Sequence, residues 1–302
     1  MKIAILSAGR KNYSTQRLME AAVARGHEAI IVNYTKAYMA IESSNQTVHA
    51  ADQEITEDVQ AVIPRIAAKH TNYGTAVLRQ FEMMRAYTAT SSLALVRSRD
   101  KLRSMQLLAR AGVGIPKTVF ASQTADANDL LELVGGAPVV VKLLESTHGS
   151  GVVLGETKKT AKSIIEAFNS INAKIILQEF VEEADGADIR VVVVGDRIVA
   201  SMMRKGGEGE FRSNTHRGGQ VLPVQLTKKE ANIALKAART LGINIAGVDI
   251  IRSKRGPLIL EVNSSPSLKG VERLTGQDIA GEMIDYVVAR AQGKRTRDKI
   301  GA

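Results

Sequence analysis

The chain has 302 residues, of which 44% are apolar and 24% are charged, a composition that is ordinary for a globular protein with more than one hydrophobic core. The absence of cysteine excludes disulfide bonds and thiol catalysis, and the five histidines show no zinc-binding spacing. The net charge of +10 favours an anionic partner such as a nucleotide, RNA or an acidic protein segment. No apolar run reaches the length of a signal-peptide core or a membrane span, so we expect a cytoplasmic protein without a membrane partner.

The N-terminal third of the chain alternates between strand and helix patterns. We expect strands at residues 2–6, 28–32 and 59–63 and helices at residues 14–25 and 74–85. This βαβ order predicts a parallel sheet. The turn after the first strand, Ser7–Arg10, contains one glycine where a dinucleotide-binding fingerprint has three, which argues against a nicotinamide dehydrogenase.

A second set of strands follows a linker that we expect near residues 88–98. Residues 138–144 and 152–154 have strand patterns and enclose a glycine-containing loop at 145–151. Backbone N–H groups of such a loop can approach phosphate oxygens closely, and Lys142 can supply a positive charge to them. The alternative is a surface hairpin whose lysine marks the edge of a sheet.

Residues 174–181 have the pattern of an extended segment that passes between two subdomains. Such a segment can offer backbone groups to an adenine ring, and Asp188, which follows it, can accept a hydrogen bond from a ribose hydroxyl. The alternative is that Glu179 and Asp188 are solvated acids at strand ends. The basic stretch 204–219 contains arginines suited to carboxylate or phosphate, and a solvated basic loop is its alternative.

Two alternating segments, 246–251 and 258–263, flank a turn and predict a β-hairpin. Folding about this turn sets Asp249 opposite Glu261, and Asn263 shares their face because side chains two residues apart lie on the same side of a strand. Three oxygen ligands without histidine or cysteine suit a hard cation such as Mg²⁺, which points to phosphoryl chemistry. A solvated face that carries two acids and an amide by chance is the alternative. The opposite face is expected to be buried and consists of Val248, Ile250, Leu258, Leu260 and Val262.

The order of these features resembles the RimK family of ATP-grasp carboxylate–amine ligases, whose members add glutamate to the C-terminus of a small-subunit ribosomal protein. The likeness extends from Met1 to about Ala291. It is carried by Lys101, Lys142, the runs 178–181, 188–190 and 212–214, and Asp249 with Glu261 and Asn263. Near-verbatim stretches lie at residues 99–110, 134–138, 211–219 and 246–250. The sequence departs from the family pattern at Ser146, His148, Ser150 and Ser267 and in the basic tail 290–299.

The resemblance implies an α/β (α+β) ATP-grasp fold with an N-terminal parallel βαβ domain at 1–95, a central subdomain at 96–180 and a C-terminal subdomain at 181–302, the last two of which clamp ATP. The residues implied to contact ATP are Lys101, Lys142, Glu179, Phe180, Asp188, Arg212, Ser213 and Asn214. Those implied to act in catalysis are Arg204, Arg212 and Arg217, beside the metal ligands Asp249, Glu261 and Asn263. The family also implies a Mg²⁺ cofactor. Mn²⁺ can replace it, and two ions can bind. The implied substrates are ATP and glutamate, the implied acceptor is the C-terminus of a ribosomal protein, and the implied assembly is a homo-oligomer such as a tetramer.

The expected reaction needs no side-chain nucleophile. The acceptor carboxylate attacks the γ-phosphorus of ATP, and the amine of glutamate attacks the resulting acylphosphate, while cations stabilise the phosphates. A different ATP-grasp ligase, one that joins an amino acid to a small cofactor or a carrier protein, would keep the same ATP and metal residues. A non-catalytic RNA-binding protein would explain the charge but lacks stacking platforms for bases, since only 4% of the residues are aromatic.

Overall fold

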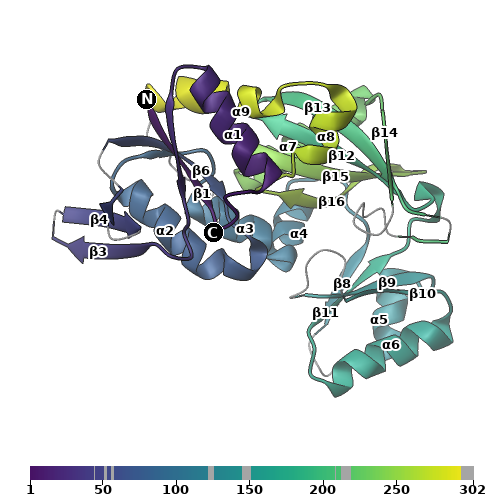
Figure 1. Cartoon of the computed structure of the whole chain (residues 1–302). Coiled ribbons are helices and arrows are strands. Elements are labelled where there is room, and N and C mark those ends of the chain that lie inside the picture. The colour runs from purple at the N-terminus through teal and green to yellow at the C-terminus, as the bar shows by residue number, and fades with distance from the viewer. Residues whose placement is uncertain are drawn as a thin grey trace.

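The computed structural model describes residues 1–43, 45–50, 53–55, 58–121, 126–144, 151–207, 209–211 and 219–293. Over these residues the chain forms three main sheets with helices packed around them, together with a small fourth sheet (Figure 1). The predicted ATP-grasp architecture, with a parallel N-terminal sheet followed by two antiparallel sheets, is confirmed.

The N-terminal region is built on a parallel sheet with the strand order β2-β1-β6-β7. Its strands are β1 (Lys2–Ser7), β2 (Glu28–Val32), β6 (Val59–Arg65) and β7 (Tyr87–Thr88), and its helices are α1 (Tyr13–Ala24), η1 (Ala68–His70) and α2 (Thr71–Met83). The middle of strand β1, residues 3–6, is apolar because helices cover both of its faces. Ile3 and Ile5 join a core with α1, whereas Ala4 and Leu6 join a core with α2.

Two elements of this region are not predicted by the sequence patterns. A small antiparallel sheet projects beside α2 and consists of β3 (Tyr38–Glu42), β4 (Asn45–Ala50) and β5 (Gln53–Glu54) (Figure 1). Helix α3 (Ser92–Arg99) occupies most of the segment where we expected a linker, so this connection is helical and not an extended loop. The hydroxyl of Ser91 accepts a hydrogen bond from the Ala94 N–H at 3.1 Å, and this N-cap begins a helix in a sequence of loop-like composition.

The central region is an antiparallel sheet with the order β10-β9-β11-β8. It follows α4 (Lys101–Arg110) and contains β8 (Thr118–Ala121), β9 (Val139–Leu143), β10 (Val152–Gly155), β11 (Ile175–Glu179) and the helices α5 (Ala127–Val134) and α6 (Lys158–Ser170). Its core is built from residues 119–177 alone and includes Val139, Ile165 and Leu177. Figure 1 shows this region set apart from the other two at the lower right.

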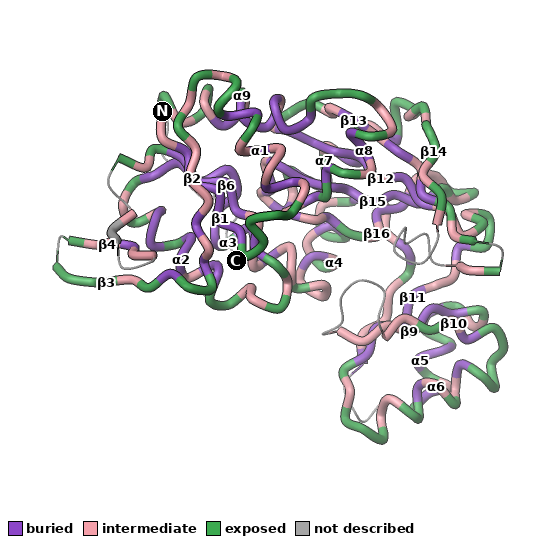
Figure 2. Tube along the Cα trace, viewed as in Figure 1, coloured by how far each residue is buried: buried purple, intermediate pink, exposed green. Residues whose placement is uncertain are grey.

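The C-terminal region is a five-stranded antiparallel sheet with the order β14-β13-β12-β15-β16. Its elements are η2 (Glu182–Ala184), β12 (Ala187–Val194), β13 (Arg197–Lys205), β14 (Gln220–Leu222), α7 (Lys228–Leu241), β15 (Ile245–Ser253), β16 (Gly256–Asn263), α8 (Lys269–Thr275) and α9 (Ile279–Ala291). Side chains of β12 alternate between two cores, with Val191 and Val193 against α7 and Val192 and Val194 against α8 and α9. Figure 2 shows that these central strands are buried along most of their length.

The hairpin of β15 and β16 has the predicted register at its functional end. Asp249 lies opposite Glu261 as expected. The expectation that Leu260 is buried with Ile250 is wrong, because the register shifts between Asp249 and Ile250 and pairs Ile250 with Ile259. Leu260 is partly buried and packs instead with a small separate cluster that contains Val181, Ile251 and Leu258.

The N-terminal and C-terminal regions share a hydrophobic core. Leu18 of α1 and Ile5 of β1 belong to the same buried cluster as Ile245 of β15 and Ile284 of α9. Figure 1 shows α9 lying beside α1 across this junction. In the described part of the chain, none of the helices combines the length and apolar character needed to cross a membrane.

Candidate active site

Asp249 is the most buried charged side chain of the candidate site, with an exposed fraction of 2%. The strand register places it opposite Arg190 of β12. The guanidinium of Arg190 donates from Nε to Oδ1 at 2.7 Å and from Nη2 to Oδ2 at 2.6 Å, and Arg204 Nη2 lies 2.9 Å from Oδ2. Two arginines from neighbouring strands therefore compensate one buried carboxylate.

Arg204 is held by a second acid. Asp188 lies opposite Arg204 in the β12–β13 pair and accepts hydrogen bonds from Nε at 2.7 Å and from Nη2 at 2.5 Å. Both residues are buried. Asp188 was predicted to contact ATP, and the structure places its carboxylate against Arg204, where it fixes the position of that guanidinium.

These pairs set the charge states of the buried groups. Burial by itself would raise the pKa of Asp249, but the guanidiniums of Arg190 and Arg204 outweigh it and hold this pKa well below its ordinary value. Burial lowers the pKa of Arg204, and the carboxylates of Asp249 and Asp188 reverse this effect and raise it. Asp249 and Arg204 therefore stay ionised at neutral pH.

Glu261 and Asn263 of β16 lie next to Asp249 and complete the predicted ligand set. The Asn263 amide donates to Glu261 Oε1 at 2.9 Å and lies 3.5 Å from Asp249 Oδ2. The Glu261 side chain is 55% exposed, so its carboxylate is accessible. Its pKa is raised, first by desolvation from the surrounding protein and then by the charge of Asp249.

The donor set fits a hard divalent cation. Two carboxylates and an amide are oxygen ligands of the kind that Mg²⁺ prefers, and an open site leaves positions for water and phosphate. Across the described residues, no group of three or more His, Cys, Asp or Glu side chains is placed to bind a metal. The candidate site is not a group of that kind, because it combines two carboxylates, Asp249 and Glu261, with the amide of Asn263.

Two lysines face Glu261 from the central side. Lys142 of β9 donates to Gln178 Oε1 at 2.5 Å, and Lys101 at the start of α4 donates to the backbone oxygen of Leu143 at 3.2 Å. Burial lowers the pKa of Lys142 to about 8; the charge of Glu261 opposes this change and that of Lys101 adds to it. Burial also lowers the pKa of Lys101, and Glu261 again opposes it. Three charges from different elements thus lie within electrostatic reach of one another.

Gln178 is a site residue that the sequence analysis did not single out. It is buried, and its amide bridges Lys142 on β9 and the Thr118 hydroxyl on β8. Arg190 was also missed as a site residue. Its pairing with Asp249 joins positions 59 residues apart, and only the strand register reveals it.

The hinge segment contains Glu179 and Phe180, both predicted to contact ATP. Glu179 accepts a hydrogen bond from the backbone N–H of Lys117 at 2.6 Å and pairs with Arg255, which lies at the tip of the β15–β16 hairpin. Phe180 makes an edge-to-face contact with Phe211, with ring centroids 6.4 Å apart. The Glu179 side chain therefore secures the crossing between the two regions.

Several predicted residues lie outside the described part of the chain. These are the arginines and polar residues of the basic loop, Arg212, Ser213, Asn214 and Arg217, together with Ser146, His148 and Ser150 of the glycine-containing loop. Most of the basic tail, from residue 294 to residue 299, lies outside it as well.

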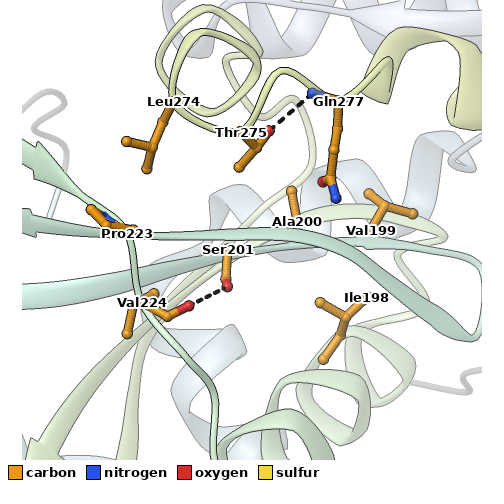
Figure 3. A pocket seen from close by; sticks show the side chains of 9 residues that line it. All are labelled: Ile198, Val199, Ala200, Ser201, Pro223, Val224, Leu274, Thr275 and Gln277. Atoms are coloured by element: carbon orange, nitrogen blue, oxygen red, sulfur yellow. Dashed lines mark hydrogen bonds between the residues drawn. The ribbon is translucent and has the colours of Figure 1, made fainter.

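A cavity of about 320 Å³ lies away from these charges (Figure 3). It is lined on the β13 side by Ala200 and Ser201 and on the α8 side by Leu274 and Thr275. Within the figure, Ser201 donates to the Val224 carbonyl and the Gln277 N–H donates to the Thr275 hydroxyl. Its lining contains no ionisable side chain, so we do not assign catalysis to it.

Comparison with known proteins identifies the family of the chain. Family profiles match a RimK PreATP-grasp domain over residues 1–95 and a RimK-like ATP-grasp domain over residues 98–287. A protein of Aliivibrio fischeri named probable alpha-L-glutamate ligase is 55% identical over 299 residues, which is 99% of each chain. A protein of the same name from Syntrophotalea carbinolica is 53% identical over the same length.

Solved structures agree on the fold. The RimK domain protein ATP-grasp from Sphaerobacter thermophilus has a TM-score of 0.71 and 22% identity, covering 95% of this chain and 100% of its own. The ATP-grasp ligase PsnB, complexed with a phosphomimetic variant of its minimal precursor, Mg and ADP, has a TM-score of 0.73 and 20% identity, covering 95% and 97%. The chain therefore belongs to the RimK-like ATP-grasp family.

Proposed function

We propose that this protein is an ATP- and Mg²⁺-dependent ligase that joins the α-amine of glutamate to the C-terminal carboxylate of a ribosomal protein. The observation that carries the proposal is the meeting of Asp249, Glu261 and Asn263 with Lys101 and Lys142, which come from different regions of the fold. The full-length relatives named probable alpha-L-glutamate ligase support the choice of glutamate.

The nucleotide end of the site is assigned to the lysines and the three oxygen ligands. Lys101 and Lys142 neutralise the phosphates of ATP, and Gln178 orients Lys142 toward them. Asp249, Glu261 and Asn263 would hold Mg²⁺, which would neutralise charge on the transferred phosphoryl group. The hinge around Phe180 would contact the adenine ring.

The proposed reaction has two steps. An oxygen of the acceptor carboxylate forms a bond to the γ-phosphorus, and ADP leaves, which gives an acylphosphate. The amine of glutamate then attacks the acyl carbon, loses a proton and expels inorganic phosphate, which leaves a new peptide bond. Arg204, fixed by Asp188, supplies a preorganised positive charge near these oxygens, so catalysis rests on position and electrostatics.

A ligase for a small cofactor or a carrier protein is the second candidate, because it would use the same ATP and metal residues. One experiment distinguishes the two candidates. The protein is incubated with ATP, Mg²⁺ and glutamate in the presence of either ribosomal proteins or small acceptors, and the masses of the intact products are measured. Addition of glutamyl units to one ribosomal protein supports the proposal. ATP hydrolysis that depends on a small acceptor, with no change in any ribosomal protein, would refute it.

A further inference from the structure

Two arginines meet at the junction of the N-terminal and C-terminal regions without an acidic partner. Arg65 ends β6 and donates from Nη1 to the backbone oxygen of Pro266 at 2.7 Å. Arg99 ends α3 and donates from Nη2 to the backbone oxygen of Ile66 at 2.8 Å. The Nε of Arg99 is buried and has no hydrogen-bond partner. Among the described residues, no carboxylate lies within ion-pairing distance of either guanidinium.

The environment of this arginine pair is unfavourable for positive charge. Desolvation and, to a smaller extent, the nearby charge of Arg99 together lower the pKa of Arg65 to about 10. Burial lowers the pKa of Arg99 as well, against the opposing charge of Glu261. Arg65 and Arg99 are both half-buried. Arginines that are largely withdrawn from water are normally compensated by acids, as Arg190 and Arg204 are here. A bound anion would supply the compensation that the arginine pair lacks.

The arginine pair is connected to the metal ligands by direct packing. Pro266, which accepts the hydrogen bond from Arg65, follows Asn263 by three residues. A Cβ placed on Gly247 of β15 would lie 3.0 Å from the Cβ of Pro266 and 3.7 Å from the Nε of Arg190. The segment that contains Pro266 is therefore pressed against the strand that carries Asp249.

Further polar groups lie at the same junction. Ser265 donates to the backbone oxygen of Pro64 at 3.2 Å, and the buried hydroxyl of Ser264 has no hydrogen-bond partner. Ser264 and Arg65 line a cavity of about 10 Å³, which is roughly the size needed for one water. This junction lies at the carboxyl end of the parallel strand β6, where open α/β sheets bind their ligands.

We infer that Arg65 and Arg99 form a subsite that binds a carboxylate of the incoming glutamate, an inference that rests on the proposed ligase function. The amine of this substrate reacts, so its two carboxylates remain anionic throughout and require cationic partners. Lys101 and Lys142 approach Glu261 from the central region, whereas the arginine pair comes from the N-terminal region. The planar guanidinium fork also matches a carboxylate in a bidentate manner.

The test compares Arg65→Gln and Arg99→Gln with the control Arg79→Gln, which removes an exposed charge from α2 of the same region. We expect the KM for glutamate to rise about tenfold or more, because each lost charge-assisted hydrogen bond is strong. The KM for ATP and for the acceptor should change less than about twofold on the same scale. Glutamine lacks the γ-carboxylate and glutamate α-amide lacks the α-carboxylate. When each replaces glutamate, the arginine variants should no longer raise the KM for the amine that lacks the carboxylate bound by the subsite.

Lysine variants and direct binding measurements exclude misfolding as the cause of a higher KM. Arg65→Lys and Arg99→Lys keep a charge and should keep the wild-type melting temperature without substrates, yet still raise the KM for glutamate. An equal rise in the KM for ATP, or a rise in the KM for the acceptor alone, would overturn the inference. An unchanged KM for glutamate in folded variants would overturn it as well. Calorimetric binding of glutamate to the wild type and to Arg99→Gln, with a non-hydrolysable ATP analogue, tests the subsite without turnover. If the wild type ligates nothing but binds glutamate through Arg99, the proposed function fails and the subsite stands.

Discussion

The C-terminal sheet contacts its two neighbours in different ways. Toward the N-terminal region it shares a continuous apolar core and a network of ion pairs between α1 and the last helices. Arg17 lies 3.2 Å from Glu272 and 2.9 Å from Asp278, and Arg25 lies 3.1 Å from Asp278 and 2.7 Å from Asp285. The Glu272 side chain is only 5% exposed, so its ion pair is partly desolvated, and the shared apolar core holds the two regions together.

The sheet of the central region contacts the C-terminal region through polar groups near the hinge, where Arg255 pairs with Glu179. The segment that leads from α4 into β8 instead packs on the C-terminal sheet, where the Ile259 N–H donates to the Gly114 oxygen at 2.8 Å and Val113 joins the core beside α7. The apolar core of the central sheet stays within its own residues 119–177. We therefore expect the central region to change its orientation at small cost in free energy.

The difference separates the site into a fixed half and an adjustable half. The fixed half carries Asp249, Glu261 and Asn263 and the proposed glutamate subsite. The adjustable half carries Lys142 and Gln178, which we propose to face the phosphates of ATP. We expect ATP binding to bring the halves together, so that variants in the fixed half change chemistry and stability while variants in the adjustable half change nucleotide affinity.

The largest effect is expected for Glu261→Gln in the fixed half. The change keeps the shape of the side chain and removes one charge from the metal site, so ligase activity should fall about 100-fold or more. ATP affinity should become less dependent on Mg²⁺, and the unfolding midpoint should not change. The control is Glu132→Gln, an exposed acid on α5. Wild-type turnover of Glu261→Gln at limiting Mg²⁺ would rule out the metal assignment.

Asp188→Asn should destabilise the fixed half. It leaves the buried guanidinium of Arg204 with one carboxylate where it had two, and breaking such a buried pair costs about 3 kcal/mol. Urea unfolding measures this change. The matched control is Asp185→Asn, whose exposed carboxylate pairs with Lys205 and whose loss should leave the midpoint unchanged. Equal midpoints for the two variants would show that the Asp188 pair does not stabilise the fold.

Arg17→Ala tests the junction between α1 and α8. It leaves the buried carboxylate of Glu272 with fewer donors, and we expect a loss of about 1–2 kcal/mol in the free energy of unfolding. The KM for ATP should not change, because the adjustable half is untouched. Arg197→Ala, whose partner Glu282 is exposed, serves as the control. A KM for ATP that rises with the loss of stability would mean that the two halves are not independent.

The pH dependence of ATP binding reports on Lys142. Its pKa of about 8 lies below the ordinary 10.5, so the ammonium is present at pH 7 and is lost as the pH rises through about 8. ATP affinity should therefore fall by up to about tenfold between pH 7 and pH 9. The same shift makes the charged form unfavourable for folding below about pH 8, and this penalty is relieved as the pH rises from 8 toward 10.5.

Lys142→Arg is the matched variant, because its guanidinium stays charged over this range. Its ATP affinity should be independent of pH between 7 and 9, whatever its absolute value. Lys142→Ala should bind ATP weakly at every pH, and its apo melting temperature should not fall, because the variant also removes a buried charge. An unaltered pH profile in Lys142→Arg would show that another group titrates.

The features that the sequence predicts correctly are those with local causes. The turn between residues 253 and 257 fixes the pairing of Asp249 with Glu261, and alternation places Asn263 on the same face. The β-bulge that moves Leu260 away is not visible in this alternation, because only the packing against α7 selects Ile259. Helix α3 was missed because Ser91 and Ser92, which begin it, are also typical of loops.

Other parts of the site depend on contacts between distant segments. Arg190 reaches Asp249 across 59 residues, and Gln178 reaches Lys142 across 36. Arg65 and Arg99 come together only because β6 and α3 end at the same junction. Single-sequence patterns contain no information on such pairings, so these residues became visible only in the structure.

The most direct test of the metal site is anomalous diffraction from crystals grown with Mn²⁺ and a non-hydrolysable ATP analogue. We expect an anomalous peak at coordination distance, about 2.1 Å, from oxygens of Glu261 and Asn263, with Asp249 alongside and Lys142 on the phosphates. A metal bound only by phosphates and water, or by residues outside this set, would contradict the assignment.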